Sequence, residues 1–160
     1  FIESNVNRTG VLLNKLQVLR ENLETEIDNQ LLEVEMRDNA LLIRVDSDDS
    51  FASGSAELRP NFLVLLSEIA QSIAGLTDSI SIEGHTDNVP ISFRESFQSN
   101  WDLSAARASS VASALVTEPG LEDIEYEILG FADTVPIASN ETSQGRSQNR
   151  RIEIKMSDFN

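Results

Sequence analysis

Cysteine and long apolar runs are both missing from this sequence of 160 residues. The absence of cysteine excludes a disulfide framework, a thiolate metal site and a thiol nucleophile. No stretch approaches the roughly 18 apolar residues that a membrane-spanning helix needs. The sequence begins Phe1-Ile2-Glu3, without an initiator methionine or the basic and apolar regions of a signal peptide. We therefore expect it to be part of a longer protein.

Positive charge is also in short supply. The sequence has 12 lysines and arginines against 27 aspartates and glutamates, which gives a formal net charge of −15. Nucleic acid binding depends on cations that displace counterions from phosphates. This balance therefore argues against nucleic acid, and against an anionic membrane surface, as partners. The acidity favours solubility, and any anionic ligand would need a locally basic site.

Hydrophobic residues make up 40% of the sequence, enough to expect a folded core. Residues 1–30 are expected to form one helix outside that core, because their apolar residues recur near a heptad spacing. The stripe consists of Val6, Leu12, Leu13, Leu16, Leu19, Leu23 and Ile27. It fits two alternatives, packing on the same chain or on a second copy of the chain as a dimer seam.

Residues 31–160 are expected to form a second unit in which strands and helices interleave. Asp38-Asn39 favours a hairpin turn, Pro60 suits the first turn of a helix, and Gly75 suits a left-handed cap. The pattern predicts strands at 31–36 and 40–45, a helix at 60–74, a strand at 79–83, a loop at 84–103, a helix at 105–116, and strands at 124–129 and 151–156. This order predicts an α/β fold, a two-layer sandwich of helices on a mixed sheet, preceded by the helix of residues 1–30.

The helix expected at 105–116 has an unusual first turn. Ser104 would be its N-cap, and Arg107 then stands where a capping box has Glu or Gln. A cation there faces the positive end of the helix dipole, which disfavours it by roughly 0.3–1 kcal/mol. Free N–H groups beside a guanidinium would suit a carboxylate ligand. The alternative is an arginine that simply pairs with Asp87 or Asp102.

Asp87 ends the run Gly84-His85-Thr86-Asp87, just after an expected strand, where loops often carry function. If the strand end and the helix start are neighbours, Asp87 and Arg107 meet near one pocket. A carboxylate beside a guanidinium would recognise a zwitterion. A structural salt bridge would use the same two residues.

Other chemistries find less support in the sequence. His85 is the only histidine and lacks the partners of a metal site, so we expect it to serve in hydrogen bonding. The acidic run 46–57 is spaced like a calcium loop, but Phe51 stands where the sharp turn needs Gly. Nucleophile-elbow and phosphate-loop motifs are absent. A glycan hydrolase with Asp87 as its acid is the remaining enzymatic alternative.

Three separated motifs resemble the OmpA-like peptidoglycan-binding family, whose fold is an α/β sandwich. They are IEGHTDNVP at 82–90, NWDLSAARA at 100–108 and GRSQNRRIEI at 145–154. FASGSAEL at 51–58 and the loop at 91–99 further resemble the B subunits of flagellar stators, the MotB and PomB family. The helix before residue 39 is similar to the linker that joins the membrane span of those subunits to their anchor domain.

The resemblance implies a binding module rather than an enzyme, with no cofactor and no metal. The peptidoglycan-binding residues implied by it surround one pocket: Asp87 and Arg107 as contacts of diaminopimelate in a stem peptide, Thr86, Asn100 and Leu103 as lining, and Arg150 or Arg151 at the border.

By the same resemblance, the domain at 31–160 is a periplasmic anchor that fixes an ion-driven stator to the cell wall for torque generation. The implied partners are peptidoglycan, a second copy of the chain and the stator A subunit (MotA or PomA). The last would be reached through a single inner-membrane span outside this sequence. Alternatives are an OmpA- or Pal-type envelope anchor without a link to motility, a peptidoglycan hydrolase, and a dimerisation scaffold in which Asp87 and Arg107 form a plain ion pair.

Overall fold

Five strands form one mixed sheet in this computed structural model, which describes residues 2–92 and 96–157, with side chains from residue 8 onward. The strands are β1 (Glu33–Arg37), β2 (Ala40–Asp46), β3 (Ser79–His85), β4 (Glu125–Gly130) and β5 (Arg151–Met156). Their order is β1-β2-β5-β3-β4. β3 and β4 run parallel, whereas the other neighbouring strands are antiparallel. The predicted mixed sheet is therefore confirmed.

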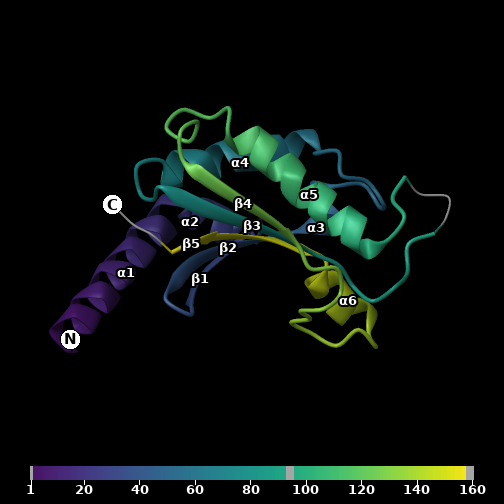
Figure 1. The fold of residues 1–160 in the computed structure, drawn as a ribbon, viewed down its shortest axis with the longest axis horizontal. Coiled ribbons are helices and arrows are strands. Elements are labelled where there is room, and N and C mark those ends of the chain that lie inside the picture. Colours follow the sequence, from purple (N-terminus) through teal and green to yellow (C-terminus); the bar gives the residue numbers. More distant parts are fainter. Residues whose placement is uncertain (1, 93–95, 158–160) are drawn as a thin grey trace.

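Helices form the second layer (Figure 1). They are α1 (Ile2–Asn22), α2 (Glu24–Asp28), α3 (Ser47–Ser50), α4 (Pro60–Ile73), α5 (Asn100–Leu115) and α6 (Ser143–Asn149). α4 and α5 lie side by side over one face of the sheet, and α6 lies at the end remote from α1. This arrangement confirms the predicted two-layer sandwich. Within the described residues, no helix combines the length and the apolar character that crossing a membrane requires.

Turn and cap residues behave as the sequence predicts. Asp38 and Asn39 have φ values of 53° and 62°, as the two central residues of a type I′ hairpin turn require. Gly75 follows α4 with a φ of 79°, a left-handed conformation that a glycine adopts without a Cβ clash. These local signals fix the β1–β2 hairpin and the end of α4.

The apolar stripe of α1 packs into the core of the same chain. Leu12, Leu16, Leu19 and Leu23 are buried in one cluster with the inward-facing residues of the sheet and of α4. The expectation that the helix of residues 1–30 lies outside the core is therefore wrong for this stretch, and the intramolecular alternative describes these four side chains. Leu13 is 49% exposed. The side chain of Val6 lies outside the described residues, and the domain boundary at residue 30 stays a prediction.

The single helix expected at residues 1–30 is interrupted at Leu23. This residue has φ −110° and ψ 19°, away from helical values, while its side chain is fully buried. The amide of Ile27 still donates to the Leu23 carbonyl oxygen at 2.9 Å. The interruption is therefore a bend between α1 and α2 that follows the surface of the core.

Two glycines bring α5 directly against the ends of β3 and β4. A Cβ atom at Gly84 would overlap the carbonyl oxygen of Ser104, and one at Gly130 would lie 2.7 Å from the amide nitrogen of Ala105. Such distances are too short for any residue with a side chain. The close approach sets the first half of α5 beside the loop that follows β3, and the candidate site lies at this junction.

Candidate functional site

A cleft of about 460 Å³ lies where the segment after β2, the loop after β3, α5 and the end of α6 meet. Its lining comprises Asp48, Phe51, Ser53, Gly54, Arg59, Thr86, Asp87, Val89, Pro90, Ile91, Asn100, Leu103, Arg107 and Arg150. Asp87, Arg107, Thr86, Asn100, Leu103 and Arg150 had been singled out from the sequence, and the fold brings all six to this cleft. Arg151, the remaining candidate, does not line it.

Asp87 is mostly buried in the wall of the cleft, with 11% of its side chain exposed. Its Oδ2 accepts a hydrogen bond from Arg150 Nη1 at 2.6 Å, and its Oδ1 accepts one from the amide of Val89 at 3.0 Å. The Asn100 side-chain amide donates to the Asp87 and Val89 carbonyl oxygens at 3.4 and 3.0 Å. Among the described residues, the ion pair of Asp87 is thus with Arg150 and not with Arg107.

Arg150 bridges two carboxylates across the cleft. Its Nε and Nη2 donate to Oδ1 and Oδ2 of Asp48, both at 2.8 Å, in the bidentate geometry that matches guanidinium to carboxylate. The Ser147 hydroxyl donates to Asp48 as well, at 2.9 Å. The hydrogen bond from Arg150 is the main cause of a lowered pKa at Asp48, and the same bond raises the pKa of Arg150 above its usual value. Asp48 was not found from the sequence, since nothing local links it to residue 150.

Arg107 reaches the cleft from the interior of α5. Its side chain is nearly buried, with its Nε donating to the Ser55 carbonyl oxygen at 2.7 Å and its Nη2 to that of Ala52 at 3.1 Å. The guanidinium carbon lies 4.9 Å from the centre of the Phe51 ring, a cation–π contact. These contacts tie the loop at 52–55 to α5 and orient the guanidinium at the cleft.

The helix that carries Arg107 begins earlier than predicted. The N-cap of α5 is Ser99, whose hydroxyl accepts from the amide of Asp102 at 3.3 Å, while Asp102 Oδ2 accepts from the amide of Gln98. Ser104 lies inside the helix, and its hydroxyl accepts from the amide of Ala132 at 3.1 Å. Arg107 is therefore about two turns from the helix start. The predicted site of free helix N–H groups beside Arg107 is wrong.

Arg151 lies on the opposite side of the sheet from the core cluster, together with Glu153 and His85. It is fully buried there, and its Nε donates to Glu153 Oε2 at 3.0 Å. Its other nitrogens donate to the carbonyl oxygens of Asn149 and Val135 at 3.1 and 2.9 Å. Of the two neighbouring arginines, it is Arg150 that borders the cleft, because consecutive residues at the start of a strand point to opposite sides.

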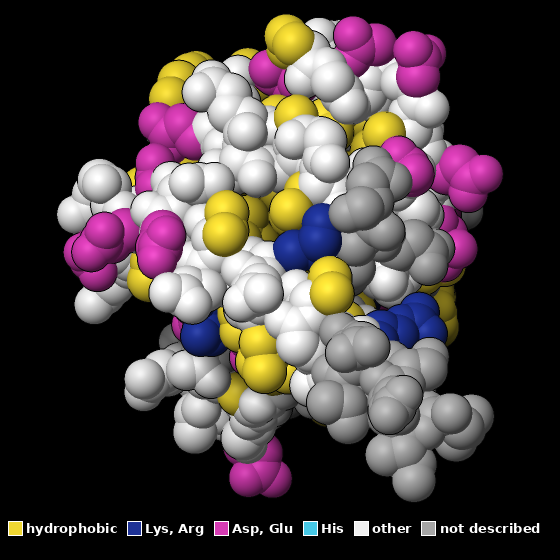
Figure 2. Space-filling model, turned by 90° about the vertical axis from the view of Figure 1, so that its left-hand side faces the viewer, with side chains coloured by type: hydrophobic (Ala, Val, Ile, Leu, Met, Phe, Trp, Pro, Cys, Tyr) yellow, Lys and Arg dark blue, Asp and Glu magenta, His cyan; other side chains and the backbone are white. Residues whose placement is uncertain are grey.

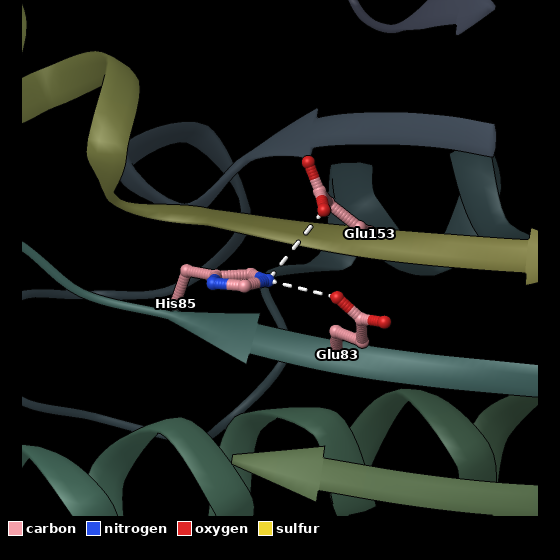
Figure 3. A group of neighbouring side chains, drawn as sticks. All are labelled: Glu83, His85 and Glu153. Carbon is pink, nitrogen blue, oxygen red and sulfur yellow. Dashed lines mark hydrogen bonds and ion pairs between the residues drawn. The ribbon is translucent and has the colours of Figure 1, made fainter. Parts of the chain in front are cut away.

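His85 meets two carboxylates that the sequence did not reveal (Figure 3). Its Nε2 lies 3.1 Å from Glu83 Oε1 and 3.5 Å from Glu153 Oε1, so these groups have the spacing of a metal site. The other oxygens of the two glutamates are paired with Lys155 at 2.9 Å and with Arg151. These cations already balance both carboxylates, and a divalent ion would add uncompensated charge. The geometry thus favours the predicted hydrogen-bonding role of the histidine.

The cleft differs in charge from the rest of the molecule. Three arginines and two aspartates line it, in a chain whose formal net charge is −15. Figure 2 shows acidic side chains spread around the margins of the face at the α1 end, with few basic ones among them. The cleft therefore provides the locally basic site that an anionic or zwitterionic ligand needs, with carboxylates available for an ammonium group.

The fold and the charged cleft define an α/β domain with a candidate binding site, and comparison with known proteins identifies its family. Residues 50–150 match the model of the OmpA family. The chain is 38% identical to Motility protein B of Bacillus subtilis (strain 168) over 141 residues, which are 88% of this chain and 53% of that protein. The chain belongs to the OmpA family, and it spans about half the length of the curated relatives it matches.

Solved structures agree with this assignment. The cell wall anchor of the T6SS from Pseudomonas aeruginosa is 36% identical, with a TM-score of 0.77 over 88% of this chain and 96% of that one. The periplasmic domain of Helicobacter pylori MotB is 24% identical, with a TM-score of 0.67 over 79% of this chain and 88% of that one. At this lower identity the likeness concerns the fold alone, an OmpA-like fold on a mixed sheet.

Proposed function

We propose that this chain is a non-catalytic, periplasmic peptidoglycan-binding anchor that fixes an ion-driven flagellar stator to the cell wall. The observation that carries the proposal is the cleft that unites Asp87 and Arg107 in a strongly acidic chain. The similarity to Motility protein B over most of the chain supports the link to motility. In the whole protein, a single inner-membrane span outside this sequence would join the anchor to a stator A subunit.

The ligand we propose is a peptidoglycan stem peptide that presents the ammonium and carboxylate of diaminopimelate. Arg107 takes the carboxylate through its planar guanidinium, and Asp87 takes the ammonium. Thr86, Asn100 and Leu103 line the same cleft. Because Arg151 points to the other side of the sheet, it contributes only by fixing the start of β5.

Binding to insoluble peptidoglycan tests the proposal directly. The chain should sediment with purified sacculi that contain diaminopimelate, and soluble muropeptides should not be released during the incubation. Release of muropeptides would favour the hydrolase alternative. Absence of sedimentation at any protein concentration would contradict the anchoring function itself.

Substitution of the two charged residues should weaken binding strongly. Losing one partner of a desolvated charge pair costs about 2–5 kcal/mol, so Asp87→Asn and Arg107→Ala should each reduce the affinity for a diaminopimelate muropeptide by well over tenfold. Calorimetry measures this change. Asp123→Asn and Arg8→Ala, which alter exposed residues of the same types, should bind like the unchanged protein.

Arg107→Ala needs a further control, because the residue also supports the fold. Its hydrogen bonds to the carbonyls of Ala52 and Ser55 should make this variant melt at a lower temperature. Binding is therefore measured well below the melting transition, and Arg107→Lys is compared because it keeps the charge. Unchanged affinity in Asp87→Asn and in both Arg107 variants would show that the ligand binds elsewhere.

An envelope anchor outside the flagellar motor is the second candidate function. The T6SS cell wall anchor from Pseudomonas aeruginosa aligns with this chain over 96% of its own length, and this similarity favours the second candidate function. The same cleft would serve either assembly. Deletion of the gene for the full-length protein separates the two. Loss of swimming with a normal flagellar filament supports the stator role, whereas normal swimming supports the other anchor.

We also propose that the chain forms a homodimer. Only part of the apolar stripe of α1, the possible dimer seam, is exposed for contact with a second copy. Leu16 and Leu23 are buried within the same chain, which counts against their use between two copies. Val11, Leu13 and Val18 are each about half exposed on α1. A contact between copies would therefore use these side chains and be weak in the isolated chain.

A further inference from the structure

Asp87, the residue proposed to take the ligand's ammonium group, already pairs with a side chain of the protein. Arg150 Nη1 lies 2.6 Å from Asp87 Oδ2, and the second oxygen of Asp87 accepts from the amide of Val89. An ammonium group that approaches Asp87 therefore meets a carboxylate whose oxygens are both engaged. It has to share Oδ2 with Arg150 or displace it.

The contacts of Arg150 make displacement possible without exposing an unpaired charge. Two of its nitrogens are held by Asp48 at 2.8 Å, and only one faces Asp87. Asp48 is in turn fixed by the hydroxyl of Ser147. If Arg150 leaves Asp87, its bidentate pair with Asp48 remains, and bidentate pairs are the stronger kind. Asp87 can thus exchange partners while Arg150 stays compensated.

We propose that Arg150 is a built-in competitor for the ligand's ammonium group at Asp87, and that Asp48 sets how strongly it competes. This inference rests on the proposed function and deepens it. Before a ligand binds, Arg150 pairs with both aspartates, as in the structure. In the liganded cleft it pairs with Asp48 alone, and Asp87 binds the ammonium.

The arrangement makes Arg150 and Asp48 determinants of ligand selectivity. The apparent affinity for a ligand falls in proportion to the fraction of protein whose site is available, so Arg150 lowers affinity for ligands that carry an ammonium group. A ligand with carboxylates alone does not need Asp87 and is not subject to this competition. Without Asp48, displacement would leave the Arg150 charge uncompensated beside the incoming ammonium.

The test compares meso-diaminopimelate with pimelate, which has the same carbon chain and carboxylates but no ammonium groups. Affinities are measured by NMR titration of the whole chain. Arg150→Gln should raise the preference for diaminopimelate over pimelate by about tenfold, and Asp48→Asn should lower it by a similar factor, a size usual for coupled charged neighbours. In the double variant, the preference should lie close to that of Arg150→Gln, because Asp48 acts through Arg150.

Arg146→Gln is the matched control, since Arg146 lies one turn earlier in α6 and donates to the Asn140 carbonyl oxygen outside the cleft. It should leave the preference unchanged. A preference that falls or stays constant in Arg150→Gln would overturn the inference, as would equal losses for both ligands, which would mark Arg150 as a direct carboxylate contact. The proposed function fails separately, if the unchanged protein does not sediment with sacculi.

Discussion

The pKa of the buried Glu153 carboxyl group is set by its charged neighbours. Glu153 is 1% exposed and lies 3.0 Å from Arg151 Nε and 3.2 Å from Arg44 Nε. Burial alone would raise its pKa, but the charge and hydrogen bond of Arg151, with further help from His85 and Arg44, lower the pKa overall. A lowered folded-state pKa means that the carboxylate stabilises the fold above its unfolded pKa, and that this stability is lost as the pH falls through the folded pKa.

We therefore expect Glu153→Gln to reduce the free energy of unfolding at pH 7 by about 3–5 kcal/mol, the usual cost of breaking a buried pair. The variant should also lose less stability than the unchanged protein as the pH falls below about 4.5. Urea unfolding at a series of pH values measures both effects. Glu127→Gln, at an exposed position of β4, is the control and should change neither. Parallel pH curves for Glu153→Gln and the unchanged protein would contradict this account.

The sequence predicted which residues line the cleft better than it predicted which of them form ion pairs with one another. Asp87 and Arg107 were found because their motifs and residue types point to a charged site, and the fold brings both to one cleft. The pairing of Asp87 with Arg150 depends on the antiparallel register of β3 and β5, in which His85 lies opposite Arg151. Nothing in the local sequence specifies that register.

Among the elements, α1 departs most from the expectation of a linker outside the core. Its buried face supplies Leu19, which is fully buried in the common cluster. Leu19→Ala should reduce the free energy of unfolding by about 3 kcal/mol, because a large buried side chain leaves a cavity. Leu13→Ala, on the half-exposed face of the same helix, should cost less than about 0.5 kcal/mol. Urea unfolding followed by circular dichroism measures both values.

Equal and small effects of the two substitutions would contradict this assignment, because they would mean that α1 is not part of the cooperative fold. A loss confined to Leu19→Ala would confirm that the second half of α1 belongs to the domain. The exposed face of the same helix, including Leu13 and Val18, would then be the part able to contact a second copy.

Elements with strong local signals were predicted well, and elements set by distant contacts were not. The turn at Asp38-Asn39 and the cap at Gly75 follow from backbone conformations that few residues adopt easily. The start of α5 was misplaced because Ser99 and Ser104 are equally good caps by composition. Tertiary contact decided between them, since the Ser104 hydroxyl is used by Ala132.

For the whole molecule, the order β1-β2-β5-β3-β4 explains why the motifs meet. β5, which comes last in the sequence, lies between β2 and β3, so the end of α6 reaches the loop after β3. The sequence predicted a mixed sheet from the order of elements, but the position of β5 within it requires pairings across more than 100 residues. The three family motifs therefore indicated that their residues share one site, but the geometry of that site could not be predicted from the sequence.

The net charge of the whole molecule predicts how its melting temperature depends on salt. With a formal charge of −15, repulsion between exposed carboxylates opposes the compact state, and salt screens exposed charges more than buried pairs such as that of Glu153 with Arg151. Raising NaCl from about 20 to about 300 mM should therefore raise the melting temperature by roughly 3 °C, which corresponds to about 1 kcal/mol for a domain of this size. Tetramethylammonium chloride at equal ionic strength should have the same effect if screening is the cause. A melting temperature that falls with salt would mean that the ion pairs of the sheet outweigh the repulsion.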